Sequence, residues 1–216
     1  MTATNTPAPS TLVDPRPMLT TSIAVAGAVI GAVRPDQMAN STPCGSYDVR
    51  ELLGHFLAAL DRVGVVGRDE NPFVRPEEIV PADGDWVAAW HQLAEQATAA
   101  WADPAALVRP TKLPWAAASG ALALRTYVAE FTAHTWDLAQ ATGQHPAWDD
   151  EVLTMSLDVM REVLPAEGRR AMFDAIRATM PEDMRGRPDP YDAAVPVEPG
   201  ASLIDQLIAH VGRRPS

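Results

Sequence analysis

The sequence predicts an all-α protein. Alanine-rich segments carry apolar residues three and four positions apart, which is the spacing of one face of a helix. Alternating runs of β-branched residues with the length of a strand are nearly absent. Long connections follow the first predicted helix and separate the third from the fourth. Because such connections can cross the body of a domain, they favour a four-helix bundle with additions.

The first helix is expected from about Pro15 to Val33. Asp14 is in position to act as its N-cap, and Pro15 at the first helical position sacrifices no hydrogen bond. Gly27 and Gly31 lie one turn apart on the same side of this helix, so a neighbouring helix can approach closely. In a soluble protein, such a pair is a packing notch far more often than the seam of a membrane dimer.

A second helix is expected to begin at Asp48, which can accept a backbone N–H while Glu51 bonds back to the cap. His55 lies at the flank of the apolar stripe of this helix, so its ring should be at least partly buried. Residues 67–85 include three prolines and are expected to form a loop over one end of the body. Loops of this length are often functional.

Asp85 is expected to cap a third helix that reaches about Ala102 and carries tryptophans in the core. After a connection that contains prolines, Ser119 can open a fourth helix that runs to Gly143, because glycine is a natural C-terminal stop. Further helices are expected at about residues 149–164, 167–180 and 202–211, with a proline- and charge-rich stretch at 181–199.

The composition argues against several partners. The 17 basic and 28 acidic residues give a formal charge of −11, and no basic patch offsets this field, so nucleic acid is not expected to bind. The most apolar run, residues 23–33, is well short of the ~20 residues that cross a bilayer. No membrane span is therefore expected.

The sequence also suggests a cytoplasmic protein of one domain. Its single cysteine, Cys44, rules out an intrachain disulfide and a thiolate-rich zinc site, and it is compatible with a reducing compartment. The N-terminus lacks the basic start and apolar stretch of a secretory signal. Residues 1–13 are expected to form a disordered arm, and residues 14–216 a metal-binding helical bundle with a short C-terminal extension.

The strongest candidate for chemistry is the pair Glu130 and His134, because residues four apart on a helix point the same way. His55 from the second helix would complete a set of two imidazoles and one carboxylate, which leaves a divalent metal an open position. The pair faces the body of the domain, where a cation can compensate a desolvated carboxylate. The alternative is a helix-stabilising pair, worth about 0.2–0.5 kcal/mol when exposed.

Spacing alone does not select this pair. Glu51 and His55 are also four apart, and His91 and Glu95 repeat the pair in reverse order. Glu51 is better explained as the capping partner of Asp48. His91 and Glu95 are expected to face solvent on the third helix.

Three segments carry a resemblance to a known family: residues 42–55 (TPCGSYDVRELLGH), 130–144 (EFTAHTWDLAQATGQ) and 207–215 (LIAHVGRRP). Together, and in this order, they resemble the actinobacterial mycothiol-dependent maleylpyruvate isomerase metal-binding family of the DinB-like superfamily. The resemblance implies a DinB-like four-helix bundle with additional C-terminal helices. It also implies that His55, Glu130 and His134 match the family's ligands to a divalent metal, which is most often zinc, with nickel or another ion possible.

The resemblance further implies thiol chemistry. In the isomerase branch, a low-molecular-weight thiol adds to an activated carbon–carbon double bond, allows rotation and leaves, while other branches transfer thiols to electrophiles. Mycothiol is thus the expected co-substrate and a small electrophile the second partner. Two alternatives stay open: a non-catalytic metal- or small-molecule-binding protein or sensor, and hydrolysis by metal-bound water, for which Tyr127 and Asp137 are the nearby proton-transfer candidates. A homodimer is possible.

Further residues near the predicted site have two interpretations each. Asp137, one turn beyond His134, either orients a ligand imidazole or makes a buried structural hydrogen bond. Cys44 could approach the metal, although a small buried thiol is more common. The isomerase branch carries an arginine for substrate carboxylates, and Arg213 or Arg214 could serve, although a terminal Arg-Arg is more often solvated.

Overall fold

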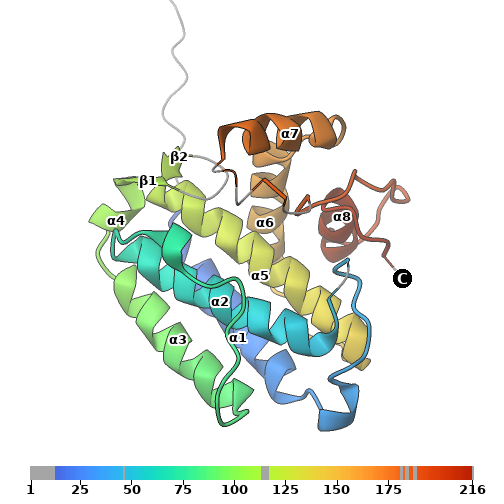
Figure 1. Ribbon diagram of the computed structural model, residues 1–216. Helices are drawn as coiled ribbons and strands as arrows, with labels where there is room; N and C mark the ends of the chain where they lie inside the picture. Colours follow the sequence, from blue (N-terminus) through green and yellow to red (C-terminus); the bar gives the residue numbers. More distant parts are fainter. Residues whose placement is uncertain are drawn as a thin grey trace, which may run out of the picture.

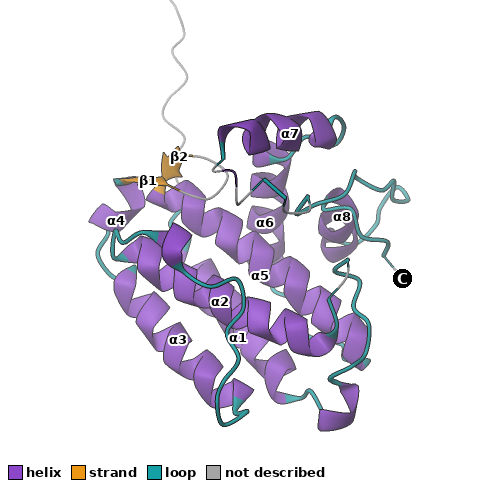
Figure 2. Cartoon of the chain, viewed as in Figure 1, coloured by secondary structure: helices purple, strands orange, loops and turns teal. Residues whose placement is uncertain are grey.

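The structure is a computed structural model that describes residues 13–45, 47–112, 117–180, 182, 185–186 and 189–215. These residues contain eight α-helices and two strands of three residues each. Helix dominates the molecule (Figure 2), so the predicted all-α class is confirmed. The N-terminal arm predicted for residues 1–13 lies, except for Val13, outside the described residues.

Four helices form the bundle: α1 (Arg16–Gly31), α2 (Val49–Gly67), α3 (Trp86–Ala100) and α5 (Gly120–Thr142). They make a closed ring, in which α1 and α2 each contact both α3 and α5. Helices α2 and α5 therefore run side by side (Figure 1), although 52 residues separate the end of one from the start of the other.

The other elements lie around this bundle: the 3₁₀ turns η1 (Pro35–Gln37) and η2 (Pro72–Val74), and the helices α4 (Ala105–Val108), α6 (Asp150–Val163), α7 (Arg169–Thr179) and α8 (Leu203–His210). Helix α6 packs on α5 and α1, and α8 packs on α6 and α5. The last three helices lie within two residues of their predicted bounds. Among the described residues, no helix is both long and apolar enough to span a membrane.

The sequence did not predict the small sheet or α4. Strands β1 (Pro110–Lys112) and β2 (Ala117–Ser119) pair antiparallel, with Pro110 opposite Ser119. Both strands lie in the proline-containing connection that leads to the fourth predicted helix. Three residues are too few for an alternating pattern to be recognised, so periodicity could not have revealed them.

Local sequence explains the helix ends. The Asp48 carboxylate accepts the backbone N–H of Glu51 at 2.8 Å, and the Glu51 carboxylate accepts that of Asp48 at 2.9 Å, which confirms the predicted capping box. Asp85 and Ser119 likewise accept backbone N–H groups in the first turns of α3 and α5. Gly143 ends α5 with a φ of 68°, a left-handed conformation that favours glycine.

Helix α1 differs slightly from the prediction. Pro15 is its N-cap and not its first helical residue, and the helix ends at Gly31, two residues before Val33. Asp14 still accepts the backbone N–H of Arg16 at 3.0 Å. The Asp14 carboxylate thus satisfies a free amide of the first turn, although Asp14 lies one residue before the N-cap.

Helix α5 lies between two apolar cores. One core fills the space between α1, α2, α3 and α5, and the other joins the opposite side of α5 to α6, α7 and α8. A polar side chain on α5 is therefore enclosed on nearly every side, and it needs a partner there.

The predicted notch at Gly27 is confirmed. A Cβ at this position would lie 2.8 Å from Trp90 Nε1 of α3, whereas at Gly31 the nearest atom, on Val87, would be 4.0 Å away. Trp90 cannot move aside easily, because it is 1 % exposed and its ring packs edge-on against Phe56. Close approach of α1 and α3 thus depends on Gly27.

We expect Gly27→Ala to lower the free energy of unfolding by about 1–3 kcal/mol, because the new methyl group overpacks the contact with Trp90. Gly31→Ala is the matched control: its methyl group makes an ordinary contact, and alanine favours a helix by up to about 1 kcal/mol over glycine. Urea unfolding followed by circular dichroism measures both changes. Equal stability of the two variants would contradict the expectation.

Candidate metal centre

The three predicted ligand residues lie together between α2 and α5. His55 projects from α2, and its Nε2 is 3.3 Å from Oε1 of Glu130 on α5. The rings of His55 and His134 meet edge to face, with centroids 4.9 Å apart. One donor atom from each of the three residues lies within 4.8 Å of the other two. Small side-chain adjustments would place each of these atoms ~2.0–2.2 Å from a shared ion, the distance at which such donors bind zinc.

A pair of phenylalanines packs between α2 and α5 at this point. Phe56 and Phe131 are both fully buried, and their rings are nearly parallel, with an interplanar angle of 8° and centroids 6.4 Å apart. Phe56 follows His55 in the chain, and Phe131 follows Glu130. The two rings therefore belong to the packing of α2 against α5 directly beside His55 and Glu130.

Glu130 and His134 have the protonation states that metal ligands require. Burial alone would raise the pKa of Glu130, but the contact with His55 and the electrostatic effect of the two nearby histidines bring it below its ordinary value. Burial lowers the pKa of His134, although its hydrogen bond to Asp137 acts in the opposite direction. Glu130 is thus a carboxylate and His134 a neutral imidazole at neutral pH, as metal binding demands.

Asp137 contacts the Nδ1 edge of the His134 ring. Its Oδ2 lies 3.0 Å from Nδ1 of His134, and its side chain is fully buried. Burial alone would raise the pKa of Asp137, but the hydrogen bond to His134 and the charge of Arg213 bring it below its ordinary value. Asp137 is therefore a carboxylate that accepts the Nδ1–H, which leaves Nε2 of His134 with its lone pair.

Arg213 reaches the same cluster from the C-terminal segment. It is 8 % exposed, and its Nε and Nη2 donate to the two carboxylate oxygens of Asp137 at 3.2 and 3.0 Å. The expectation that the terminal Arg-Arg is solvated is wrong for Arg213, because a buried carboxylate requires a partner charge. It holds for Arg214, which is exposed. Sequence reasoning missed this contact because nothing local to residue 213 indicates that the chain returns to α5.

Cys44 is a half-buried thiol at the start of the cluster. Burial raises its pKa to about 11, although the nearby Arg213 guanidinium acts in the opposite direction. Its Sγ accepts a hydrogen bond from Arg213 Nη2 at 3.3 Å. Cys44 is therefore a protonated thiol at neutral pH.

A second donor set overlaps the first. Atoms of Cys44, His134 and Asp137 also lie within 4.8 Å of one another. Two of these residues, Cys44 and Asp137, already accept hydrogen bonds from the Arg213 guanidinium, whose positive charge repels a cation. The set with His55 and Glu130 is therefore the better cation site.

The remaining candidates have other surroundings. Glu51 belongs to the capping box of α2, and His91 and Glu95 are both exposed on α3, as predicted. Tyr127 is 1 % exposed, and burial raises its pKa, so it keeps its proton. Both oxygens of Asp137 are engaged by Arg213 and His134. Neither Tyr127 nor Asp137 thus has the surroundings of a general base for hydrolysis.

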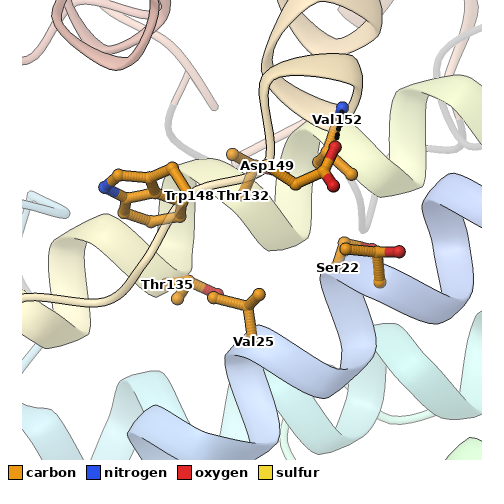
Figure 3. Close-up of a pocket in the computed structure, with 8 residues that line it drawn as sticks. Ser22, Val25, Thr132, Thr135, Trp148, Asp149 and Val152 are labelled. Carbon is orange, nitrogen blue, oxygen red and sulfur yellow. Dashed lines mark hydrogen bonds between the residues drawn. The ribbon is translucent and has the colours of Figure 1, made fainter.

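A small cavity lies between α1, α5 and the start of α6 (Figure 3). Ser22 and Val25 of α1 face Thr135 of α5 across it, and Trp148 and Asp149 border it near α6. It has room for about one water molecule. Because its lining includes none of the three predicted ligand residues, this cavity is separate from the candidate metal centre.

Fold and site together define a class: an all-α bundle protein with two histidines and a glutamate clustered between two of its helices. Residues 19–139, more than half of the chain, match the family described as mycothiol maleylpyruvate isomerase N-terminal domain. The chain belongs to this family. The matched range includes His55, Glu130 and His134, and it ends before α6, so Arg213 lies outside it.

Two relatives resemble the chain over most of its length. Both are uncharacterized proteins of Mycobacterium tuberculosis, one from strain CDC 1551 / Oshkosh and one from strain H37Rv. Each is 27 % identical over 187 residues, which covers 86 % of this chain and 90 % of the relative. A stretch of this length extends beyond residues 19–139. No solved structure matches the chain.

Proposed function

We propose that the protein holds one divalent metal ion through His55, Glu130 and His134, with zinc as the first choice. We further propose that it uses this ion to bind a small thiol such as mycothiol. The reaction would be thiol-dependent isomerisation of a small electrophile, or transfer of the thiol to it. The observation that carries the proposal is the convergence of these three donors from α2 and α5.

The donor chemistry fits a catalytic type of metal site. Two imidazoles and one carboxylate leave the fourth position of a tetrahedral ion open for a small molecule. Nickel and other divalent ions accept the same nitrogen and oxygen donors. The side chains of His55 and Glu130 keep 18 % and 14 % of their surface exposed, so a small ligand has an approach to the open position.

The side chains around the donors favour an external thiol. A bound divalent cation would lower the pKa of a coordinating thiol and so supply a thiolate at neutral pH. Cys44, the single cysteine of the chain, does not provide one, because its pKa is about 11 and Arg213 donates a hydrogen bond to its sulfur. The Tyr47 ring lies 5.6 Å from the ring of His55, where it can contact an incoming ligand.

A titration of cobalt-substituted protein with mycothiol tests this function. Coordination of the thiol should add a sulfur-to-cobalt charge-transfer band in the near ultraviolet, and His134→Ala should lose it. A panel of cis-configured unsaturated keto acids and aryl halides then tests for turnover. Thiol binding without turnover would favour a non-catalytic binding protein or sensor, and absence of the band would count against thiol binding at the metal.

A further inference from the structure

The C-terminal turn of α8 directs Arg213 into the bundle. Gly212 has a φ of 90°, and its N–H and that of Arg213 donate to the carbonyls of Ala209 and Ile208 at 3.1 and 3.0 Å. This pair of hydrogen bonds is a Schellman motif, which closes a helix and reverses the chain. The residue after the glycine is thereby turned back toward α5.

Every nitrogen of the Arg213 guanidinium has a partner within the protein. Besides the two bonds to Asp137, Nη1 donates to the carbonyl of Val211 at 3.1 Å, and Nη2 also contacts Cys44 Sγ. The guanidinium also lies 5.9 Å from the centre of the Tyr191 ring. A side chain held in this way is poorly placed to receive a substrate carboxylate.

We propose that Arg213 is a positioning residue of the metal centre: it fixes the Asp137 carboxylate, and Asp137 in turn orients the imidazole of His134. This inference rests on the proposed function, because it concerns the ligand set of that same site. It makes the C-terminal segment, which the family match does not cover, a part of the centre.

The physical reason lies in how Asp137 is held. Its two oxygens accept three hydrogen bonds, two from Arg213 and one from His134. Without the guanidinium, the carboxylate keeps only the bond to His134, and it can rotate about its own side chain. The imidazole then loses the fixed direction that a rigid acceptor provides. Loss of such an outer partner typically weakens metal binding by about 10–100-fold.

The test compares zinc affinity, measured by competition with a chromophoric chelator, among folded variants. Arg213→Met should bind zinc about 10–100-fold more weakly than the wild type, and Arg213→Lys should recover part of the loss. Arg214→Ala, the exposed neighbour, and Cys44→Ala, which removes the thiol contact alone, should bind as the wild type does. Wild-type affinity in Arg213→Met, or an equal loss in Cys44→Ala, would overturn the proposal.

A comparison in the Asp137→Asn background covers the case in which Arg213→Met does not fold. Asp137→Asn removes the carboxylate, and the double variant with Arg213→Met removes both buried charges together. If Arg213 acts through Asp137, adding Arg213→Met to Asp137→Asn changes zinc affinity little. A further loss of tenfold or more in the double variant would contradict the proposed route.

Failure of the proposed function can be recognised separately. If the wild type binds no metal at these residues, the function fails, and the ¹⁵N chemical shifts of the His134 ring in the metal-free protein decide the role of Arg213. A hydrogen-bonded Nδ1–H in the wild type, with ring shifts that change in Arg213→Met as the bond becomes less fixed, supports positioning. Unchanged shifts in Arg213→Met overturn it.

Discussion

Glu130→Gln and His134→Ala should each weaken zinc binding by about 10²–10³-fold, because a structural zinc site of four ligands provides roughly 10–16 kcal/mol and one ligand a fraction of this. Glu130→Gln is the sharper change. It preserves the size of the side chain and removes the negative charge, and the carboxylate is the one anionic donor of the set.

The measurement is metal content by elemental analysis of protein purified without added metal, followed by chelator competition. The wild type should contain about one equivalent of divalent metal. His91→Ala is the matched control, since His91 is an exposed imidazole four residues from a glutamate on α3. Wild-type zinc affinity in Glu130→Gln would show that zinc binds through other donors.

Trp90→Ala should lower the free energy of unfolding by about 3–5 kcal/mol, the range for loss of a large aromatic side chain from a core. Trp90 is 1 % exposed, and its ring packs edge-on against Phe56 and Phe131 with centroids 5.6 and 5.8 Å away. Its Nε1 donates to the carbonyl of Ile23 at 3.2 Å, which ties α3 to α1. A cavity here would loosen the packing of α3 against α1, α2 and α5 together.

Two further variants separate the causes of this loss. Trp90→Phe keeps an aromatic ring but removes the hydrogen bond to Ile23. It should lower the free energy of unfolding by about 1 kcal/mol for that bond, and by a further amount for the smaller ring. Val87→Ala, on the same helix at a position that is 38 % exposed, should change stability by no more than about 0.5 kcal/mol. Urea unfolding curves give all three values. A cost under about 1 kcal/mol for Trp90→Ala would mean that the core collapses around the missing ring.

Some residues of the candidate site could be predicted from the sequence more directly than others. Glu130 and His134 lie four apart on one predicted helix, so their common direction follows from helix geometry alone. His55 could be proposed as the third ligand from its residue type and from the resemblance, but its contact with Glu130 could not be derived, because the side-by-side arrangement of α2 and α5 is a property of the closed bundle. Asp137 was within reach of sequence reasoning, since it lies one turn from His134.

Arg213 was not predictable in its actual role. It is 76 residues from Asp137 in the chain, and a terminal Arg-Arg has the composition of a solvated tail. Its burial depends on the packing of α8 against α5 and α6, and on the turn at Gly212. Neither of these features leaves a periodic signal that can be recognised at residue 213.

The sequence by itself determined the helices and most of their ends, because apolar periodicity and caps such as Asp48, Asp85 and Ser119 act within one or two turns of chain. Only the tertiary structure decided which donors meet and what holds them. The contact of His55 with Glu130 depends on the packing of α2 against α5, and the surroundings of His134 include Arg213, which is distant in the sequence. Both are contacts between segments distant in sequence, and they exist only when the two cores on either side of α5 are packed.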